Sequence, residues 1–228
     1  HPGEPLQIHE PGLDAAARER RVAQMLARVG LDAAMAARYP HELSGGQCQR
    51  VGIARAMIVG PRLLVCDEPV SALDVSVQAQ ILELLASLRR EHGMSILLVS
   101  HNLAVVRRLC DRVLVLYQGR MMELADSRTL FSRPLHPYTR ELLDAVPVPD
   151  PRVQPERLRR ARLGEPQEQG ESAPPGGCVF RARCPHAIPE CAARAPAWEA
   201  APGGGWVACH RFRDFAYGIS LPPETRRP

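Results

Sequence analysis

Two hydrophobic patterns alternate along the first two thirds of this 228-residue chain. Residues 14–29 and 76–90 repeat apolar side chains at the three- and four-residue spacing of a helix with one buried face. Residues 63–66 and 96–99 are continuous apolar runs, which are typical of strands buried in a sheet. Because strands alternate with helices, the pattern predicts an α/β fold with parallel core strands.

The remaining elements are short, and turn residues set their limits. We expect helices over residues 45–58, 103–109, 127–131 and 138–146, and a hairpin of strands 113–117 and 120–124 that turns at Gln118 and Gly119.

Changes in composition divide the chain into three regions. Residues 1–146 are predicted to form one α/β domain, and the first eleven of them, rich in proline and glycine, are expected to be irregular. Residues 147–177 are rich in Pro, Gly, Glu and Arg and predict a linker. Residues 178–228 carry four cysteines and predict a small C-terminal module with a tail.

The composition allows a folded core and argues against two kinds of role. Hydrophobic residues make up 45% of the chain, and the formal net charge is +4. The basic residues do not cluster with interleaved aromatic residues, so no nucleic-acid partner is expected. No apolar stretch reaches the roughly 18 residues of a membrane span, so in a transport system other chains must supply the pore.

Candidate chemistry begins at residues 43–47, which read Leu-Ser-Gly-Gly-Gln. Ser44 is expected to open a helix, and the glycines near its start let backbone amides approach a ligand closely. Exposed amides and the positive end of the helix dipole together favour an anion. This segment is therefore a candidate phosphate-binding site.

A second candidate site follows the apolar run 63–66. Asp67 and Glu68 come at the strand edge where ligands sit in open α/β sheets. Asp67 can hold Mg²⁺, and Glu68 can orient a water against a phosphoryl group. His101 follows the next apolar run, where a neutral imidazole can donate a hydrogen bond to a terminal phosphate. Taken singly, an Asp-Glu pair is more often a solvated loop or helix cap, and a lone histidine is more often structural.

The order of these motifs resembles the nucleotide-binding subunits of ABC transporters. The matching segments are the signature Leu43–Gln47, the Walker B strand Leu63–Glu68, the D-loop Ser71–Asp74 and the switch histidine His101. The resemblance implies part of an ABC-type domain that binds ATP and Mg²⁺. It also implies that Asp67 contacts the magnesium ion and that Glu68 and His101 are catalytic.

The resemblance further implies a head-to-tail dimer with a second ATP-binding subunit. In that dimer the signature would contact the γ-phosphate of ATP held by the partner, and Asp74 of the D-loop would cross the interface. The signature residues concerned are Ser44, Gly45, Gly46 and Gln47.

Three positions depart from the family pattern. Cys48 stands where arginine is usual, which removes a charge and five donors beside the signature. Cys66 precedes Asp67 and is expected to behave as a small buried hydrophobe. Asn102 replaces the more usual aspartate after His101, with little expected effect.

One family motif is missing from the sequence. No Gly-x-x-x-x-Gly-Lys-Ser/Thr loop occurs, and only residues 1–42 precede the signature, too few for the first part of the family's domain. We therefore expect the chain to be the C-terminal portion of a longer subunit and to be inactive alone. The alternative is a natural half-site protein.

Three further segments resemble the oligopeptide/dipeptide importer branch of the family, namely residues 39–42, 68–78 and 136–139. This branch implies two permease subunits that form the channel and a solute-binding protein that delivers peptide. It places the ATP-binding subunit at the cytoplasmic face of the inner membrane. Members of the branch also carry nickel and other small solutes, so the transported solute stays open.

The C-terminal cysteines are spaced C-x5-C-x6-C-x17-C, at Cys178, Cys184, Cys191 and Cys209. Four thiolates in one module suggest a metal site. Zinc usually comes with closer cysteine pairs, whereas an iron–sulfur cluster also takes four thiolates. Some members of the branch carry a 4Fe–4S cluster in this region, which favours a structural cluster here. Zinc, free thiols or disulfides are the alternatives, and a reducing compartment disfavours disulfides.

The sequence thus predicts the ATP-hydrolysing subunit of an oligopeptide or dipeptide importer. The alternative is a non-catalytic half-site or iron–sulfur regulatory protein, and the presence of Asp67, Glu68 and His101 argues against it. A DNA-repair or chromosome-structuring ATPase shares the signature but needs long heptad arms, which this sequence lacks.

Overall fold

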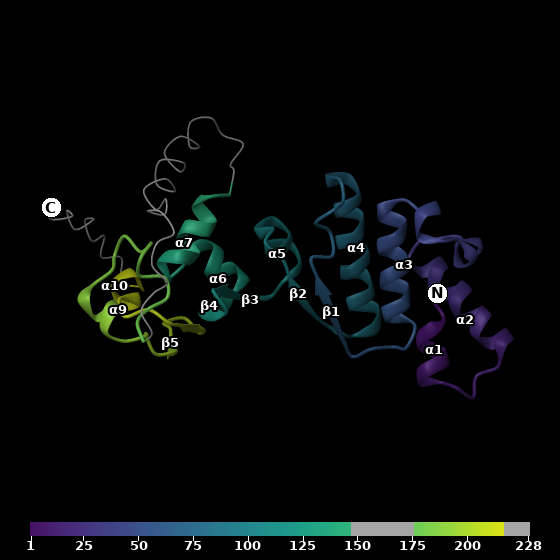
Figure 1. The fold of residues 1–228 in the computed structure, drawn as a ribbon, viewed down its shortest axis with the longest axis horizontal. Coiled ribbons are helices and arrows are strands. Elements are labelled where there is room, and N and C mark those ends of the chain that lie inside the picture. Colours follow the sequence, from purple (N-terminus) through teal and green to yellow (C-terminus); the bar gives the residue numbers. More distant parts are fainter. Residues whose placement is uncertain (147–175, 217–228) are drawn as a thin grey trace. The chain divides into compact units, whose positions relative to one another are not determined.

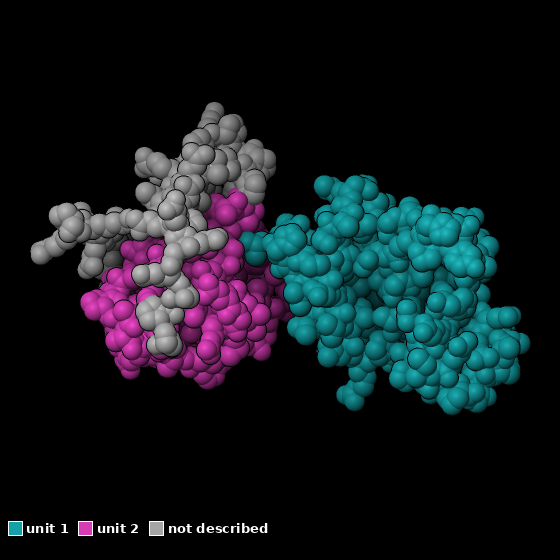
Figure 2. Space-filling view, viewed as in Figure 1, with its two compact units in different colours: residues 1–105 teal, residues 106–228 magenta. Residues whose placement is uncertain are grey.

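The computed structural model describes residues 1–146 and 176–216. The chain divides into two compact units, residues 1–105 and 106–228 (Figures 1 and 2). The boundary between them falls inside the region predicted as one domain. The predicted linker lies almost wholly outside the described residues, as does the tail after residue 216.

Unit 1 contains a parallel two-stranded sheet and the longer helices of the described residues. Its elements are α1 (Glu4–His9), α2 (Ala15–Arg28), the 3₁₀ turns η1 (Ala33–Ala37) and η2 (Pro40–Glu42), α3 (Gly45–Met57), β1 (Leu63–Asp67), α4 (Val75–His92), β2 (Ser95–Val99) and the start of α5 (Leu103–Leu109). β1 and β2 pair in parallel, from Leu63 opposite Ser95 to Asp67 opposite Val99. The α/β fold with parallel core strands is confirmed for this unit.

The helix limits follow from local capping. The Asp14 carboxylate accepts the Ala17 N–H at 2.6 Å and starts α2. Gly93 ends α4 in the left-handed conformation at φ 61°, which glycine adopts without a Cβ clash.

The prediction that residues 1–11 are irregular was wrong. They contain the helix α1, in which Pro5 lies in the first turn, where a missing N–H costs nothing. Leu6 is fully buried, and the Glu4 carboxylate lies 2.9 Å from the Arg55 guanidinium of α3. Packing within unit 1 therefore overrides the proline- and glycine-rich composition of these residues.

The prediction of fully buried strands was also wrong for one face of the β1–β2 sheet. Leu64 and Cys66 are buried, but the alternate side chains Leu63 and Val65 are 54% and 59% exposed. Leu97, opposite Val65, is 54% exposed. An apolar run predicts a strand, but it does not reveal whether another element covers both faces.

Unit 2 is built on a four-stranded antiparallel sheet in the order β3-β4-β6-β5. Its elements are β3 (Arg112–Tyr117), β4 (Arg120–Asp126), α6 (Ser127–Ser132), α7 (Pro137–Asp144), α9 (Pro189–Ala193), β5 (Glu199–Ala200), β6 (Trp206–Val207) and α10 (Phe212–Ala216). Gln118 and Gly119 both have positive φ, at 47° and 72°, as a two-residue hairpin turn requires. The predicted hairpin is confirmed.

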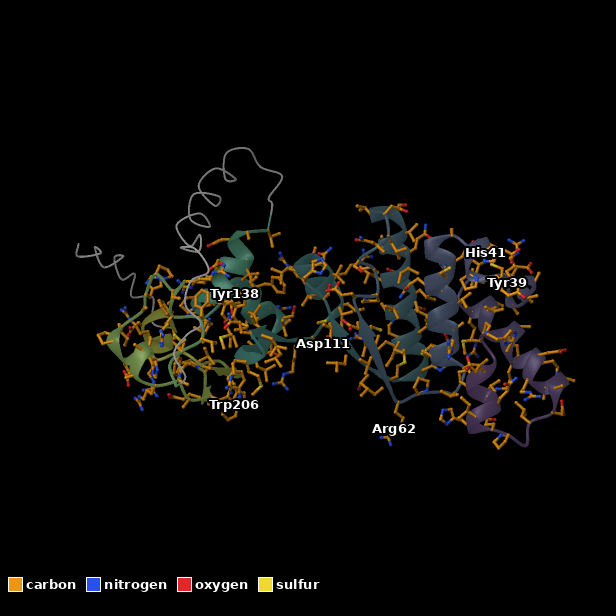
Figure 3. All side chains as sticks on the ribbon, in the orientation of Figure 1. Tyr39, His41, Arg62, Asp111, Tyr138 and Trp206 are labelled. Atoms are coloured by element: carbon orange, nitrogen blue, oxygen red, sulfur yellow. The ribbon has the colours of Figure 1, made fainter. Side chains whose placement is uncertain are left out.

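The cysteine-bearing segment does not form a separate module within the described residues. β6 pairs with β4, so that Glu123 lies opposite Val207 and Leu124 opposite Trp206. Trp206, labelled in Figure 3, is 43% exposed. Phe180 is buried against Tyr117 and Tyr138, at ring-centroid distances of 5.3 Å from each. The segment and the hairpin therefore share one core.

No helix in residues 1–146 and 176–216 is long and apolar enough to cross a membrane.

Candidate functional site

The signature segment begins helix α3 through a reciprocal capping box. The Gln47 N–H donates to Ser44 Oγ at 3.3 Å, and the Ser44 N–H donates to Gln47 Oε1 at 2.9 Å. Ser44 and Gly45 are exposed, so this helix start faces solvent. The Gln47 side-chain oxygen already accepts a hydrogen bond from the Ser44 N–H. A ligand at this helix end would have to share that hydrogen bond or replace it.

Packing explains the second glycine of the signature. A Cβ added to Gly46 would lie 2.7 Å from Cγ1 of Val77 on α4, whereas one added to Gly45 would meet Leu73 at an ordinary 3.4 Å. Gly46 therefore permits α3 to lie close against the start of α4, the helix that follows the D-loop. Gly52, farther along α3, has nothing within 4 Å of its added Cβ.

We expect opposite effects from two glycine-to-alanine changes on this helix. Gly46→Ala should destabilise unit 1 by about 1–3 kcal/mol, because the stiff Val77 side chain must move. Gly52→Ala should stabilise it by up to about 1 kcal/mol, because alanine favours a helix interior. Denaturant unfolding of the two variants measures the difference. Adding Val77→Ala should restore much of the loss in Gly46→Ala, and a failure to do so would contradict the packing assignment.

The end of β1 places a catalytic candidate in an unusual backbone conformation. Glu68 has φ 47°, one of two positive-φ non-glycine residues in the described chain. Its N–H donates to the Val99 carbonyl at 2.9 Å, which continues the pairing of β1 with β2 by one residue. Non-glycine residues in this region cost free energy and cluster at functional sites. The turn directs the Glu68 side chain toward the end of β2.

Glu68 and His101 contact each other directly. Glu68 Oε1 lies 2.7 Å from His101 Nδ1 and also accepts the His101 backbone N–H at 3.0 Å. The carboxylate is half-buried and the imidazole is 79% exposed, so one side of the pair is open to solvent. When Nδ1 donates to the carboxylate, a donor at Nε2 requires the protonated, cationic ring.

Asp67 and Asp74 occupy different surroundings. Asp67 is the exposed last residue of β1, directly before Glu68. Asp74 caps α4, because its Oδ1 accepts from Ser76 Oγ at 2.6 Å and from the Val77 N–H at 3.0 Å. The hydrogen bond from the Ser76 hydroxyl, followed by that from Val77, lowers the pKa of Asp74. Within this chain Asp74 is therefore a helix cap as well as a D-loop residue.

The structure brings only part of the predicted phosphate site together. Glu68 and His101 form one contact, whereas no hydrogen bond or ion pair in the described residues links them to Ser44, Gly45, Gly46 or Gln47. This separation agrees with a signature that acts on another subunit, and that role stays a prediction.

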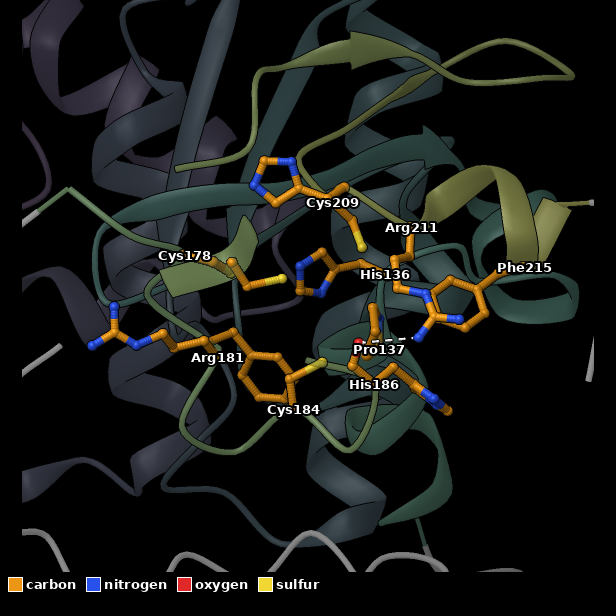
Figure 4. Close-up of a pocket in the computed structure, with 12 residues that line it drawn as sticks. His136, Pro137, Cys178, Arg181, Cys184, His186, Cys209, Arg211 and Phe215 are labelled. Carbon is orange, nitrogen blue, oxygen red and sulfur yellow. Dashed lines mark hydrogen bonds between the residues drawn. The ribbon is translucent and has the colours of Figure 1, made fainter. Parts of the chain in front are cut away.

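All four C-terminal cysteines line one pocket of unit 2 (Figure 4). Burial raises the pKa values of Cys184 and Cys209 to about 12 and also raises that of Cys178. Neighbouring pocket thiols raise them further, while Arg211 on the pocket wall opposes the rise at Cys184. Burial therefore disfavours the thiolate forms of these three cysteines.

The pocket geometry bears on which metal group fits. No group of three or more His, Cys, Asp or Glu side chains in residues 1–146 and 176–216 is arranged to hold a metal ion. Four thiolates around one zinc ion at about 2.3 Å would have to lie within about 4 Å of one another. A cluster of several metal atoms needs more widely spaced thiolates. Four thiols on the wall of one pocket are the donor type that a 4Fe–4S cluster uses, and the metal group that they hold is a matter for proposal.

No sequence signal predicted two buried polar residues that lie beside this pocket. Glu123 is 2% exposed and His136, which lines the pocket, is 1% exposed. The His136–Thr139 segment was noted only for its family resemblance, and Glu123 lies in a strand where a buried carboxylate is not expected.

Comparisons with known proteins support the family resemblance that the motifs predicted. A family model described as "ABC transporter" matches residues 4–71, and one described as "Oligopeptide/dipeptide transporter, C-terminal region" matches residues 122–191. The oligopeptide transport ATP-binding protein OppF of Haemophilus influenzae is 48% identical over 90% of this chain and 61% of its own length. The chain belongs to the oligopeptide branch of the ABC transporter ATP-binding proteins. OppF of Salmonella typhimurium is 51% identical over 86% of this chain.

This ABC protein spans about three fifths of the length of those curated relatives, covering 61% and 58% of them. Among solved structures, it is similar to the ATP-binding cassette MJ0796, described as a dimer in a post-hydrolysis state bound to ADP and Pi. That similarity has a TM-score of 0.50 and 32% sequence identity, over 55% of this chain and 54% of the other. The fold of the ABC nucleotide-binding domain is thereby confirmed for the part that matches.

Proposed function

We propose that this chain is part of an ATP-hydrolysing subunit that powers the import of oligopeptides or dipeptides. The observation that carries the proposal is the contact between Glu68 and His101 at the end of β1, at 2.7 Å. A carboxylate held in this way can orient an attacking water, and the histidine can contact the terminal phosphate. The relatives named as oligopeptide transport proteins support peptide as the transported solute.

The other site residues have complementary roles in this proposal. Asp67 would hold Mg²⁺ beside the phosphates, as a single carboxylate suffices for an ion that keeps water and phosphate ligands. The amides of Gly45 and Gly46 at the start of α3, with Ser44 and Gln47, would contact the γ-phosphate of ATP on a second subunit. Asp74 would lie at the interface between the two subunits.

The complete site needs groups that this chain does not contain. The sequence has no lysine, so the lysine of a phosphate-binding loop must come from outside these residues. The proposed partners are a second ATP-binding subunit, two membrane-spanning permeases and, indirectly, a solute-binding protein. The subunit would lie peripherally at the cytoplasmic face of the inner membrane.

We also propose that Cys178, Cys184, Cys191 and Cys209 hold a 4Fe–4S cluster. Four thiols on one pocket supply its ligand set, and the cluster would cross-link four positions of the C-terminal segment between Cys178 and Cys209. Arg181 and Arg211 line the same pocket and suit the negative charge of four thiolates. Its role would be structural.

Uptake of a labelled peptide tests the transport proposal. Cells that lack the gene should take up little labelled tripeptide, and the full-length gene should restore uptake. Nickel uptake measured in the same cells serves as the control for another solute. Restoration of nickel uptake alone would contradict the peptide assignment.

A further inference from the structure

We propose that Glu123 and His136 form a positioning pair that fixes Cys209 in the cysteine pocket, without binding the metal group themselves. The inference rests on the proposed cluster. It assigns a task to two buried polar residues that the phosphate chemistry of unit 1 does not use.

Glu123 holds the turn that precedes α7. Its Oε1 accepts the Leu135 N–H at 2.8 Å, and its Oε2 accepts the His136 N–H at 2.9 Å. The carboxylate comes from the middle of β4 and is 2% exposed. Because burying a carboxylate is costly unless it is hydrogen-bonded, this residue stabilises a specific geometry rather than the core in general.

The His136 ring is fixed on both sides. Its Nδ1 accepts the Tyr138 N–H at 3.0 Å and so caps α7. Since Nδ1 is an acceptor, the ring proton is on Nε2. The ring also lies near the backbone of Ala208, which precedes Cys209 and opposes the lowering of the His136 pKa by burial. Because Nδ1 already accepts a hydrogen bond inside the chain, that nitrogen is not available as a metal ligand.

These contacts converge on the segment that follows β6 and carries Cys209. The Ala208 N–H donates to the Met122 carbonyl at 2.9 Å, and Val207 lies opposite Glu123 in the sheet. Ala208 is therefore held by β4 on one side and lies near the His136 ring on the other. In Figure 4 the side chains of His136, Cys178 and Cys209 lie in the same pocket. The direction of the Cys209 thiol thus depends on the Glu123–His136 pair.

Residues that orient metal ligands without touching the metal typically change metal affinity by about 10- to 100-fold when replaced. We expect an effect of this size when the contact between His136 and Ala208 is removed and the cap of α7 is kept. His136→Asn makes this change, because asparagine is a good helix cap but is too short to reach Ala208.

The test uses full-length protein reconstituted anaerobically with iron and sulfide. His136→Asn should lose iron to a chelator about 10- to 100-fold faster than wild type, while the melting temperature of the metal-free protein stays close to the wild-type value. His41→Asn is the matched control, because it makes the same change at an exposed histidine and should retain iron. Should His136→Asn not fold, Glu123→Gln should show the same faster loss.

The outcomes separate this inference from the proposed cluster. Wild-type protein that takes up iron, together with a His136→Asn variant that holds it equally well, would overturn the positioning pair alone. Wild-type protein that takes up no iron would overturn the cluster. In that case alkylation of metal-free protein by iodoacetamide still tests the pair. Cys209 should react faster in His136→Asn than in His41→Asn, and equal rates would overturn its role.

Discussion

Replacing Glu68 by glutamine in the full-length protein should reduce ATP hydrolysis by about 10²- to 10⁴-fold, the range for loss of a catalytic base. Glutamine has nearly the same shape, but its amide cannot accept a proton from water. It can still accept the His101 N–H bonds through its oxygen, so the turn at the end of β1 should persist. ATP binding should therefore change little.

Phosphate release and nucleotide binding, measured on the same preparation, distinguish this role from a structural one. Glu91→Gln on α4 is the matched control, because Glu91 is exposed and its Arg28 partner lies 3.8 Å away. Undiminished turnover in Glu68→Gln would remove Glu68 from the catalytic step. Loss of ATP binding together with turnover would instead indicate that the variant had lost its structure.

Replacing Cys184 by serine should abolish uptake of the iron–sulfur cluster. The Cys184 residue is half-buried and lines the pocket, and a serine hydroxyl is a poor substitute for a thiolate ligand. Anaerobically purified wild-type protein should be brown and hold about four iron atoms per chain, the number in a 4Fe–4S cluster. The variant should be colourless.

Cys48→Ser provides the control for this cysteine change, because Cys48 lies on α3 outside the pocket. It should retain the iron content of the wild type. A wild-type protein that contains one zinc ion and no iron would reject the cluster. Equal iron content in Cys184→Ser and the wild type would remove Cys184 from the ligand set.

Local sequence signals predicted the three longest helices of unit 1, α2, α3 and α4, closely. The expected helix 76–90 extends over Val75–His92, because Asp74 caps its start and Gly93 ends it. Both are capping residues with a known local mechanism. The Gln118-Gly119 turn is another such case. The limits of elements that begin or end at capping or turn residues can thus be predicted from the sequence alone.

Features that depend on distant residues were less predictable. Helix α1 formed despite its composition because Leu6 is buried against other helices. The contact between Glu68 and His101 joins residues 33 positions apart, and the parallel pairing of β1 and β2 creates it. The Glu123–His136 contact depends on a turn closing over β4, for which no periodic signal exists.

The most direct test of the central claim measures peptide uptake and phosphate release together, in proteoliposomes that contain the full-length protein and its proposed partners. Peptide-loaded solute-binding protein should raise both rates, and Glu68→Gln should abolish both. Peptide uptake that continues in the Glu68→Gln complex, or ATP hydrolysis that proceeds without any effect of peptide, would contradict the assignment of this chain to an ATP-driven peptide importer.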